Sequence, residues 1–74
     1  MNRRPDHLTE REEEVLAAIR RSIIDRGEAL SVRELGSVLG MSSSSSVAYH
    51  LRNLVARGAL VRDGHSWRTC RLPR

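Results

Sequence analysis

The sequence predicts a mainly helical fold, with three helices followed by a small two-stranded hairpin, in a single domain that covers residues 1–74. Three observations predict this fold. Apolar residues recur at helical spacing in three stretches, each stretch is bounded by residues typical of helix ends, and the segment after Gly58 changes to short apolar runs around an Asp-Gly turn. A chain of this length has room for one modest hydrophobic core.

The first helix is expected over about residues 10–26. A capping box precedes it, in which Thr9 is the N-cap and Glu12 returns a hydrogen bond to the Thr9 backbone. Gly27 follows the last turn, as a left-handed cap does. The glutamates of the first turn suit the positive end of the helix dipole, and we interpret them as structural rather than catalytic. The apolar positions at helical spacing are Leu8, Val15, Leu16, Ile19, Ile23 and Ile24.

The second helix is short and is expected over about residues 32–39. Ser31 and Glu34 form a second capping box, and Gly40 stops the helix. Its predicted apolar face consists of Leu35, Val38 and Leu39.

Five consecutive serines follow, at residues 42–46. In isolation such a run is typical of a flexible linker. Here apolar residues continue behind it at helical spacing, serine favours caps and first turns, and Gly58 lies where a helix would end. We therefore expect a third helix over about residues 43–57, which begins at Ser43 or Ser44.

The hairpin is expected over about residues 59–72. Two short runs, 59–62 and 67–72, flank a turn that contains Asp-Gly. Cys70 is interpreted as a strand residue that faces the core, and Trp67 as a side chain that braces the hairpin.

Charge is distributed unevenly along the chain. The net charge is +4 and the sequence pI is about 11.0, and all 13 cationic side chains are arginines. Residues 1–14 contain more carboxylates than arginines, whereas residues 51–74 contain six arginines and the single carboxylate Asp63. A basic C-terminal third is typical of nucleic-acid binders, although many basic surfaces are merely solvated.

No motif indicates an enzyme, a metal site or a cofactor. The sequence pairs no nucleophile with a base and has no glycine loop for phosphate. His7, His50, His65 and Cys70 lack the close spacing of zinc ligands. His50 is interpreted as a partly buried side chain bonded to the backbone. A lone cysteine and the lack of an apolar run of about 20 residues predict a cytoplasmic protein with no membrane contact.

Three helices with a short turn before the third, followed by a hairpin, are the parts of a winged helix-turn-helix, in which the third helix enters the major groove of DNA. The side chains that read bases there must be small and polar. We expect base readout by Ser43, Ser44, Ser45, Ser46, Ala48 and Tyr49, with internal packing as the alternative for Tyr49. Phosphate or wing contacts are expected from Ser31, Arg33, Arg52, Arg62, His65 and Arg68.

Residues 8–12, 31–36, 39–54, 57–58 and 60 carry a family resemblance. In order and spacing they resemble the N-terminal DNA-binding domain of the LexA repressor family. The resemblance implies base contacts at Ser43, Ser45, Ser46, Ala48 and Tyr49. Members of this family also carry a peptidase-like domain that allows self-cleavage and supplies most of the dimer contact. This sequence stops at Arg74 without such a domain, so we expect no self-cleavage by this polypeptide. It is either an excised fragment or a freestanding regulator, and its own Met1 and its end just after the hairpin favour the freestanding regulator.

Two functional hypotheses follow. The first is a nucleoid-associated regulator, a repressor that occupies a palindromic operator as two copies, since one small domain makes too few contacts for tight specific binding. The second is a winged-helix interaction module whose third helix or hairpin docks a polymerase subunit or a full-length regulator. A steep loss of binding with salt distinguishes the first from the second.

Overall fold

The computed structural model describes residues 8–73 of the chain. Within this part there are three α-helices and one short 3₁₀ turn. Their bounds are α1 Glu10–Arg26, α2 Val32–Leu39, α3 Ser44–Ala56 and η1 Trp67–Thr69. The three α-helices lie where the sequence predicts them. In the described residues no helix is long and apolar enough to cross a membrane.

Both predicted capping boxes are present and define the starts of α1 and α2. The Thr9 hydroxyl accepts a hydrogen bond from the Glu12 backbone N–H, and the Glu12 carboxylate accepts one from the Thr9 N–H, each at 3.1 Å. Ser31 and Glu34 make the same reciprocal pair at 3.1 and 2.9 Å. Each of these pairs satisfies backbone donors that the first helical turn leaves without intrahelical partners. The caps therefore stabilise the two helix starts through local hydrogen bonds.

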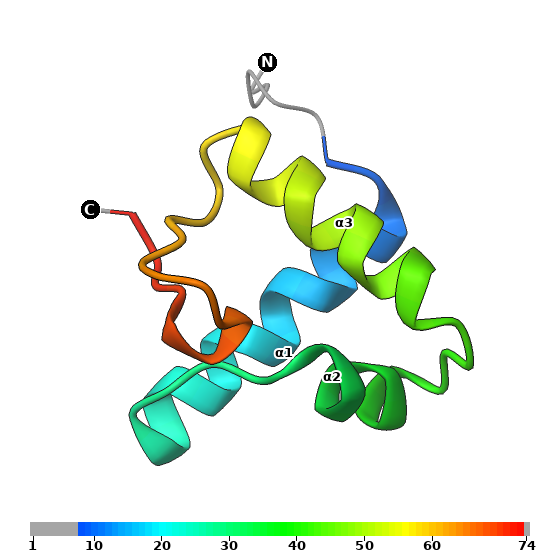
Figure 1. The fold of residues 1–74 in the computed structure, drawn as a ribbon, viewed down its shortest axis with the longest axis horizontal. Coiled ribbons are helices and arrows are strands. Elements are labelled where there is room, and N and C mark those ends of the chain that lie inside the picture. The colour runs from blue at the N-terminus through cyan, green and yellow to red at the C-terminus, as the bar shows by residue number, and fades with distance from the viewer. Residues whose placement is uncertain (1–7, 74) are drawn as a thin grey trace.

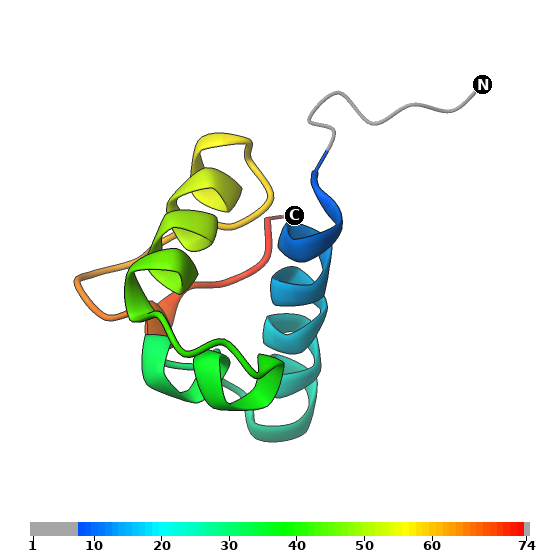
Figure 2. The same ribbon diagram turned by 90° about the vertical axis from the view of Figure 1, so that its right-hand side faces the viewer.

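The three helices enclose one hydrophobic core. Figure 2 shows α1 on one side of the molecule and α3 on the other, with α2 across one end. Val15 and Ile19 of α1 meet Val47, Leu51 and Leu54 of α3 in this core, and all five side chains are fully buried. In Figure 1 the segment after α3 folds back beside the helices. Leu60 and Cys70 of this segment complete the core.

The predicted two-stranded hairpin is not formed as strands in the residues that the structure describes. Val61 and Arg71 form an isolated antiparallel bridge, with each backbone N–H donating to the carbonyl of the other at 2.8 Å. Between them lies η1, so the prediction of a strand beginning at Trp67 is wrong. The Ser66 hydroxyl accepts from the Arg68 N–H, and the Thr69 hydroxyl donates to the Ser66 carbonyl at 2.8 Å. Such local side-chain bonds compete with a strand ladder.

The segment still packs as part of the fold. Cys70 is buried as expected, although it follows η1 and lies outside any strand. Burial raises the pKa of its thiol, and Sγ donates to the Trp67 carbonyl at 2.9 Å. The Ala29 N–H, in the connection between α1 and α2, donates to the Arg68 carbonyl at 3.1 Å. The C-terminal segment is therefore held to the connection between α1 and α2.

Candidate nucleic-acid interface

The candidate interface is the outward face of α3. Val47, Leu51 and Leu54 recur at helical spacing and are fully buried, so the opposite side of the helix faces solvent. Tyr49 and Arg52 lie on that side, and 57% of Tyr49 is exposed. The predicted readout residues Ser43, Ser44, Ser45 and Ser46 are all exposed, and Ala48 is half-buried. The buried and outward faces of α3 are thus made of different residues.

The start of α3 is suited to an anion. Ser43 is the N-cap, and its hydroxyl accepts from the Ser46 N–H at 3.2 Å. The first turn contains no acidic side chain. The positive end of the helix dipole is therefore not neutralised by a carboxylate of that turn, and such an end favours a phosphate.

Gly36 sets how closely the turn before α3 approaches α2. The Met41 N–H donates to the Gly36 carbonyl at 2.8 Å, and Gly40 ends α2 in the left-handed conformation with φ 70°. A Cβ added at Gly36 would lie 3.0 Å from the Met41 carbonyl oxygen and 3.9 Å from Val47 Cγ2. Gly36 was not among the residues predicted to form the interface. A glycine inside a short helix was the available signal, since such a glycine often marks close packing.

The helix residues that are predicted to contact phosphate differ in whether their side chains already have a partner within the domain. The Ser31 hydroxyl is half-buried and already accepts the capping bond from Glu34. Arg33 and Arg52 are exposed, and neither forms an ion pair within residues 8–73. These two arginines are therefore available to an external anion.

The cations of the C-terminal segment are mostly engaged. The Arg62 guanidinium stacks over the Trp67 ring at 4.0 Å and donates to the His65 carbonyl. Arg71 donates to Asp63 at 2.7 Å. His65 is exposed. Trp67 is half-buried and holds the Arg62 side chain at the surface, so it braces this segment without a strand.

Arg68 lies between two carboxylates. Its guanidinium nitrogens lie 3.4 Å from Glu28 and 3.2 Å from Glu34. The Ser31 backbone hydrogen bond and, to a lesser extent, the Arg68 charge outweigh partial desolvation and keep the pKa of Glu34 below its ordinary value. This pairing joins η1 to the capping box of α2, and it occupies an arginine that the sequence assigned to phosphate.

A buried carboxylate joins α1 to α3. Glu12 is only 2% exposed, and its Oε2 accepts from the Asn53 side-chain amide at 3.1 Å. His50 Nδ1 lies 3.8 Å from the same oxygen and has no hydrogen-bond partner in the described chain, so this nitrogen does not make the backbone bond that was expected of His50. Sequence reasoning gave Glu12 its capping role but missed this contact with α3.

Comparison with known proteins identifies the domain type. A family model described as the LexA DNA binding domain matches residues 5–69, which is most of the chain. The chain belongs to the LexA DNA-binding domain family. The matched range contains all of α1, α2 and α3.

Individual LexA repressors show the same relationship. The LexA repressor of Mycobacterium ulcerans (strain Agy99) is 50% identical over 56 residues, which are 76% of this chain and 23% of the relative. The LexA repressor of Mycolicibacterium gilvum (strain PYR-GCK) is 45% identical over 62 residues, which are 84% of this chain and 27% of the relative. The chain therefore spans about a quarter of the length of the relatives that it matches.

Proposed function

We propose that this chain is the operator-reading domain of a transcriptional repressor, in which α3 lies in the major groove. The observation that carries the proposal is the outward side of α3, where small polar side chains stand opposite a fully buried apolar side. Small residues let a helix backbone approach base edges, and hydroxyls can donate to or accept from either base of a pair. Membership of the LexA DNA-binding domain family supports this assignment.

Base readout is assigned to the start of α3 and to its next outward turn. The residues are Ser43, Ser44, Ser45, Ser46, Ala48 and Tyr49. Tyr49 is the largest of them, and its ring packs edge-to-face on His50 at 5.6 Å. One side of the ring is thus supported by the protein while most of the side chain stays exposed, which suits a contact with a base edge.

Phosphate binding is assigned to Arg33 and Arg52, together with the Ser31 region at the start of α2. We further propose that residues 59–72 act as the wing of a winged helix-turn-helix, with Arg62 and His65 directed to the DNA backbone. Arg68 is assigned a different role. Its ion pairs with Glu28 and Glu34 hold the wing against α2.

Two copies on a palindromic site are the arrangement that we propose for tight binding. A single domain of this size buries too little surface for high affinity, and two-fold sites double the contacts. The LexA repressors that match are about four times as long as the matched region. For this chain, pairing of the two copies is proposed to be assisted by the DNA itself or by a partner protein.

Selection from a pool of genomic DNA fragments tests the proposed function. The purified chain is mixed with the pool at two salt concentrations, and the retained DNA is sequenced. We expect one enriched palindrome and a steep loss of binding at the higher salt, because arginines that bind phosphates release counterions. Retention without sequence enrichment, or binding that ignores salt, would contradict operator reading and favour a protein-docking role for α3.

A further inference from the structure

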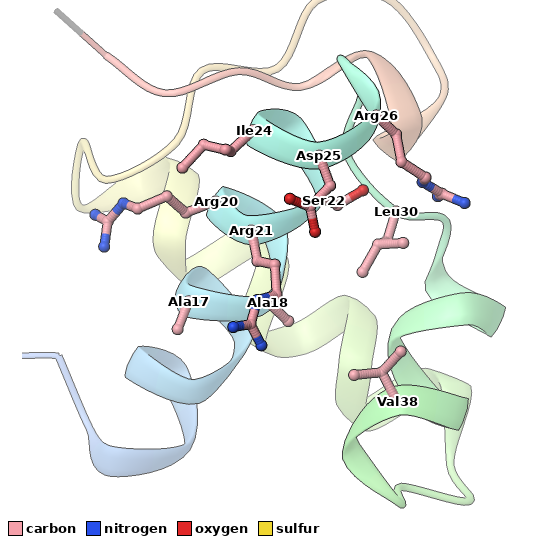
Figure 3. Close-up of a pocket in the computed structure, with 10 residues that line it drawn as sticks. All are labelled: Ala17, Ala18, Arg20, Arg21, Ser22, Ile24, Asp25, Arg26, Leu30 and Val38. Carbon is pink, nitrogen blue, oxygen red and sulfur yellow. The ribbon is translucent and has the colours of Figure 1, made fainter.

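A hollow lies on the outer side of α1, away from α3. Figure 3 shows α1 in front of α3 in this view, with α2 beside the hollow. Its apolar lining is drawn from α1, from the connection to α2 and from α2 itself, and consists of Ala17, Ala18, Ile24, Leu30 and Val38. This surface is separate from the outward face of α3.

Two apolar side chains of this hollow are exposed to an unusual degree. Ile24 is 74% exposed and Val38 is 64% exposed. The sequence pattern placed both on apolar helix faces, yet neither reaches the core. In the described chain only Tyr49, on α3, is a further large apolar residue with comparable exposure. Both side chains line the same hollow, at opposite ends of it in Figure 3. Exposed aliphatic side chains that line a hollow are typical of a protein-binding surface.

The rim of the hollow is basic. Arg20, Arg21 and Arg26 line it, whereas Asp25 is the one carboxylate in its lining. Neither Arg20 nor Arg21 has an ion-pair partner within residues 8–73. Arg26 approaches Glu34 only at 3.9 Å. The lining thus has an excess of two positive charges, and two of its arginines are free to pair with a ligand.

We propose that this hollow is a docking site for an acidic amphipathic helix of a partner protein. Apolar side chains of such a helix would cover Ile24 and Val38, while its carboxylates would pair with Arg20 and Arg21.

Charge and polarity argue for this occupant against two others. A second copy that used the same hollow would bring arginines against arginines. A nucleic-acid backbone would satisfy the arginines, but it would leave the exposed aliphatic side chains without apolar cover. An acidic amphipathic segment satisfies both parts of the surface.

The position of the hollow would allow a partner protein and DNA to bind at the same time. In Figure 2 the outer side of α1 and the outer side of α3 face in opposite directions. A partner on α1 would therefore leave the proposed DNA-reading face open. This surface differs from the third helix and hairpin, which the sequence suggested as protein-docking elements, and its test uses the free chain without DNA.

Two synthetic peptides test the proposal. The acidic probe is a helical peptide of about four turns, roughly 15 residues, with leucines at helical spacing and glutamates on either side of that stripe. The matched probe carries lysine in place of every glutamate. Each is titrated into the isotope-labelled chain while amide NMR shifts are recorded. We expect shifts in residues 17–26 and at Val38 with the acidic probe, and about tenfold weaker binding of the lysine probe.

Variants separate the two parts of the surface. Two double variants are expected to lower the affinity for the acidic probe about tenfold. One replaces Ile24 and Val38 by serine, and the other replaces Arg20 and Arg21 by glutamate. The single variant Arg21→Glu is compared with Arg11→Glu as its control, since both make the same charge change on α1 and Arg11 lies outside the hollow. Tyr49→Ser is the second control, because it removes the other exposed apolar side chain.

Several results would overturn the proposal. These are failure of the acidic probe to bind, equal binding of the lysine probe, and shifts confined to α3. Equal weakening by Arg11→Glu would show that net charge alone attracts the probe. Self-association of the chain in sedimentation, abolished by the paired serine variant, would assign the hollow to a second copy instead.

Discussion

The Asn53 side-chain amide on α3 donates a hydrogen bond to the Glu12 carboxylate on α1, 3.1 Å away. The same carboxylate closes the capping box of α1 through the Thr9 N–H. One buried acidic side chain therefore joins a helix start to the middle of the proposed reading helix. This contact couples the stability of α1 to the placement of α3.

Replacing Glu12 is expected to destabilise the domain. Glu12→Ala should lower the free energy of unfolding by about 2 kcal/mol, because it removes one half of the capping box and leaves the Asn53 amide without its acceptor. Denaturant unfolding measures the loss. Glu14→Ala is the control, since Glu14 lies on the same helix in an exposed pair with Arg11 and should cost less than about 0.5 kcal/mol. Equal losses in the two variants would show that the buried contact contributes nothing.

The pH dependence of stability should reveal the charge on Glu12. Burial raises the pKa of this carboxyl, but hydrogen bonds from Thr9 and Asn53 and the positive charge of Arg57 outweigh it, so the pKa lies below its ordinary value of 4.5. The unfolded chain therefore holds this proton more tightly than the folded chain. The stabilisation is present above pH 4.5 and is lost as pH falls through the lower folded value.

Comparison with Glu12→Gln isolates this contribution. Denaturant unfolding of both proteins over the acid range should show a steeper loss of stability in the parent chain as pH falls below 4.5. Parallel curves would mean that Glu12 has the same proton affinity in both states.

Gly36→Ala should disturb the turn that begins α3. The added Cβ would lie 3.0 Å from the Met41 carbonyl oxygen, so the turn has to move. The strain should outweigh the helix propensity gained from alanine, and a net loss of about 1 kcal/mol in unfolding free energy is expected. Ser37→Ala, at the next and exposed position of α2, is the matched control. An increase in melting temperature for Gly36→Ala would show that the turn accommodates the methyl group.

Arg52 and Arg68 should differ in their effects on DNA binding. Arg52 is exposed and forms no ion pair in the described residues. Arg52→Ala should therefore weaken binding to all DNA sequences equally, and should reduce the slope of log affinity against log salt concentration by about one. Arg68 is engaged with Glu28 and Glu34, so Arg68→Ala should leave the salt slope unchanged and lower stability by at most about 1 kcal/mol. Titrations at several salt concentrations measure both slopes. A reduced salt dependence of DNA binding for Arg68→Ala would show that Arg68 contacts a phosphate after all.

Ser45→Ala should distinguish contacts that read bases from contacts that position the protein on the phosphate backbone. Removing an exposed hydroxyl at the start of α3 should relax sequence preference while nonspecific affinity stays nearly constant. Competition between operator and random DNA measures the ratio of the two affinities. An equal fall in both would place Ser45 at a phosphate instead of a base.

The helices could be predicted because their signals are local. Thr9 with Glu12, and Ser31 with Glu34, lie within one turn of each other, and the structure forms both capping boxes. The prediction of strands in residues 59–72 failed because a hydrogen bond accepted by the Ser66 hydroxyl and one donated by the Thr69 hydroxyl favour a 3₁₀ turn. In that segment the short apolar runs alone were not sufficient to predict the backbone conformation.

Contacts between residues far apart in the sequence could not be predicted from the sequence. Arg68 is 40 positions from Glu28, and Asn53 is 41 positions from Glu12, so neither pairing leaves a local pattern. Val38 lies on the predicted apolar side of α2, but no other described element covers it. Helical periodicity identifies apolar positions without showing which of them meet a neighbour.

The serine-rich start of α3 has an evolutionary consequence. Ser44, Ser45 and Ser46 are exposed, while the core side of the helix is formed by other residues. If these residues read bases as proposed, single exchanges at these positions should alter DNA preference at little cost to folding. Domains with this architecture can diverge toward new target sites after gene duplication without first acquiring compensating mutations in the core.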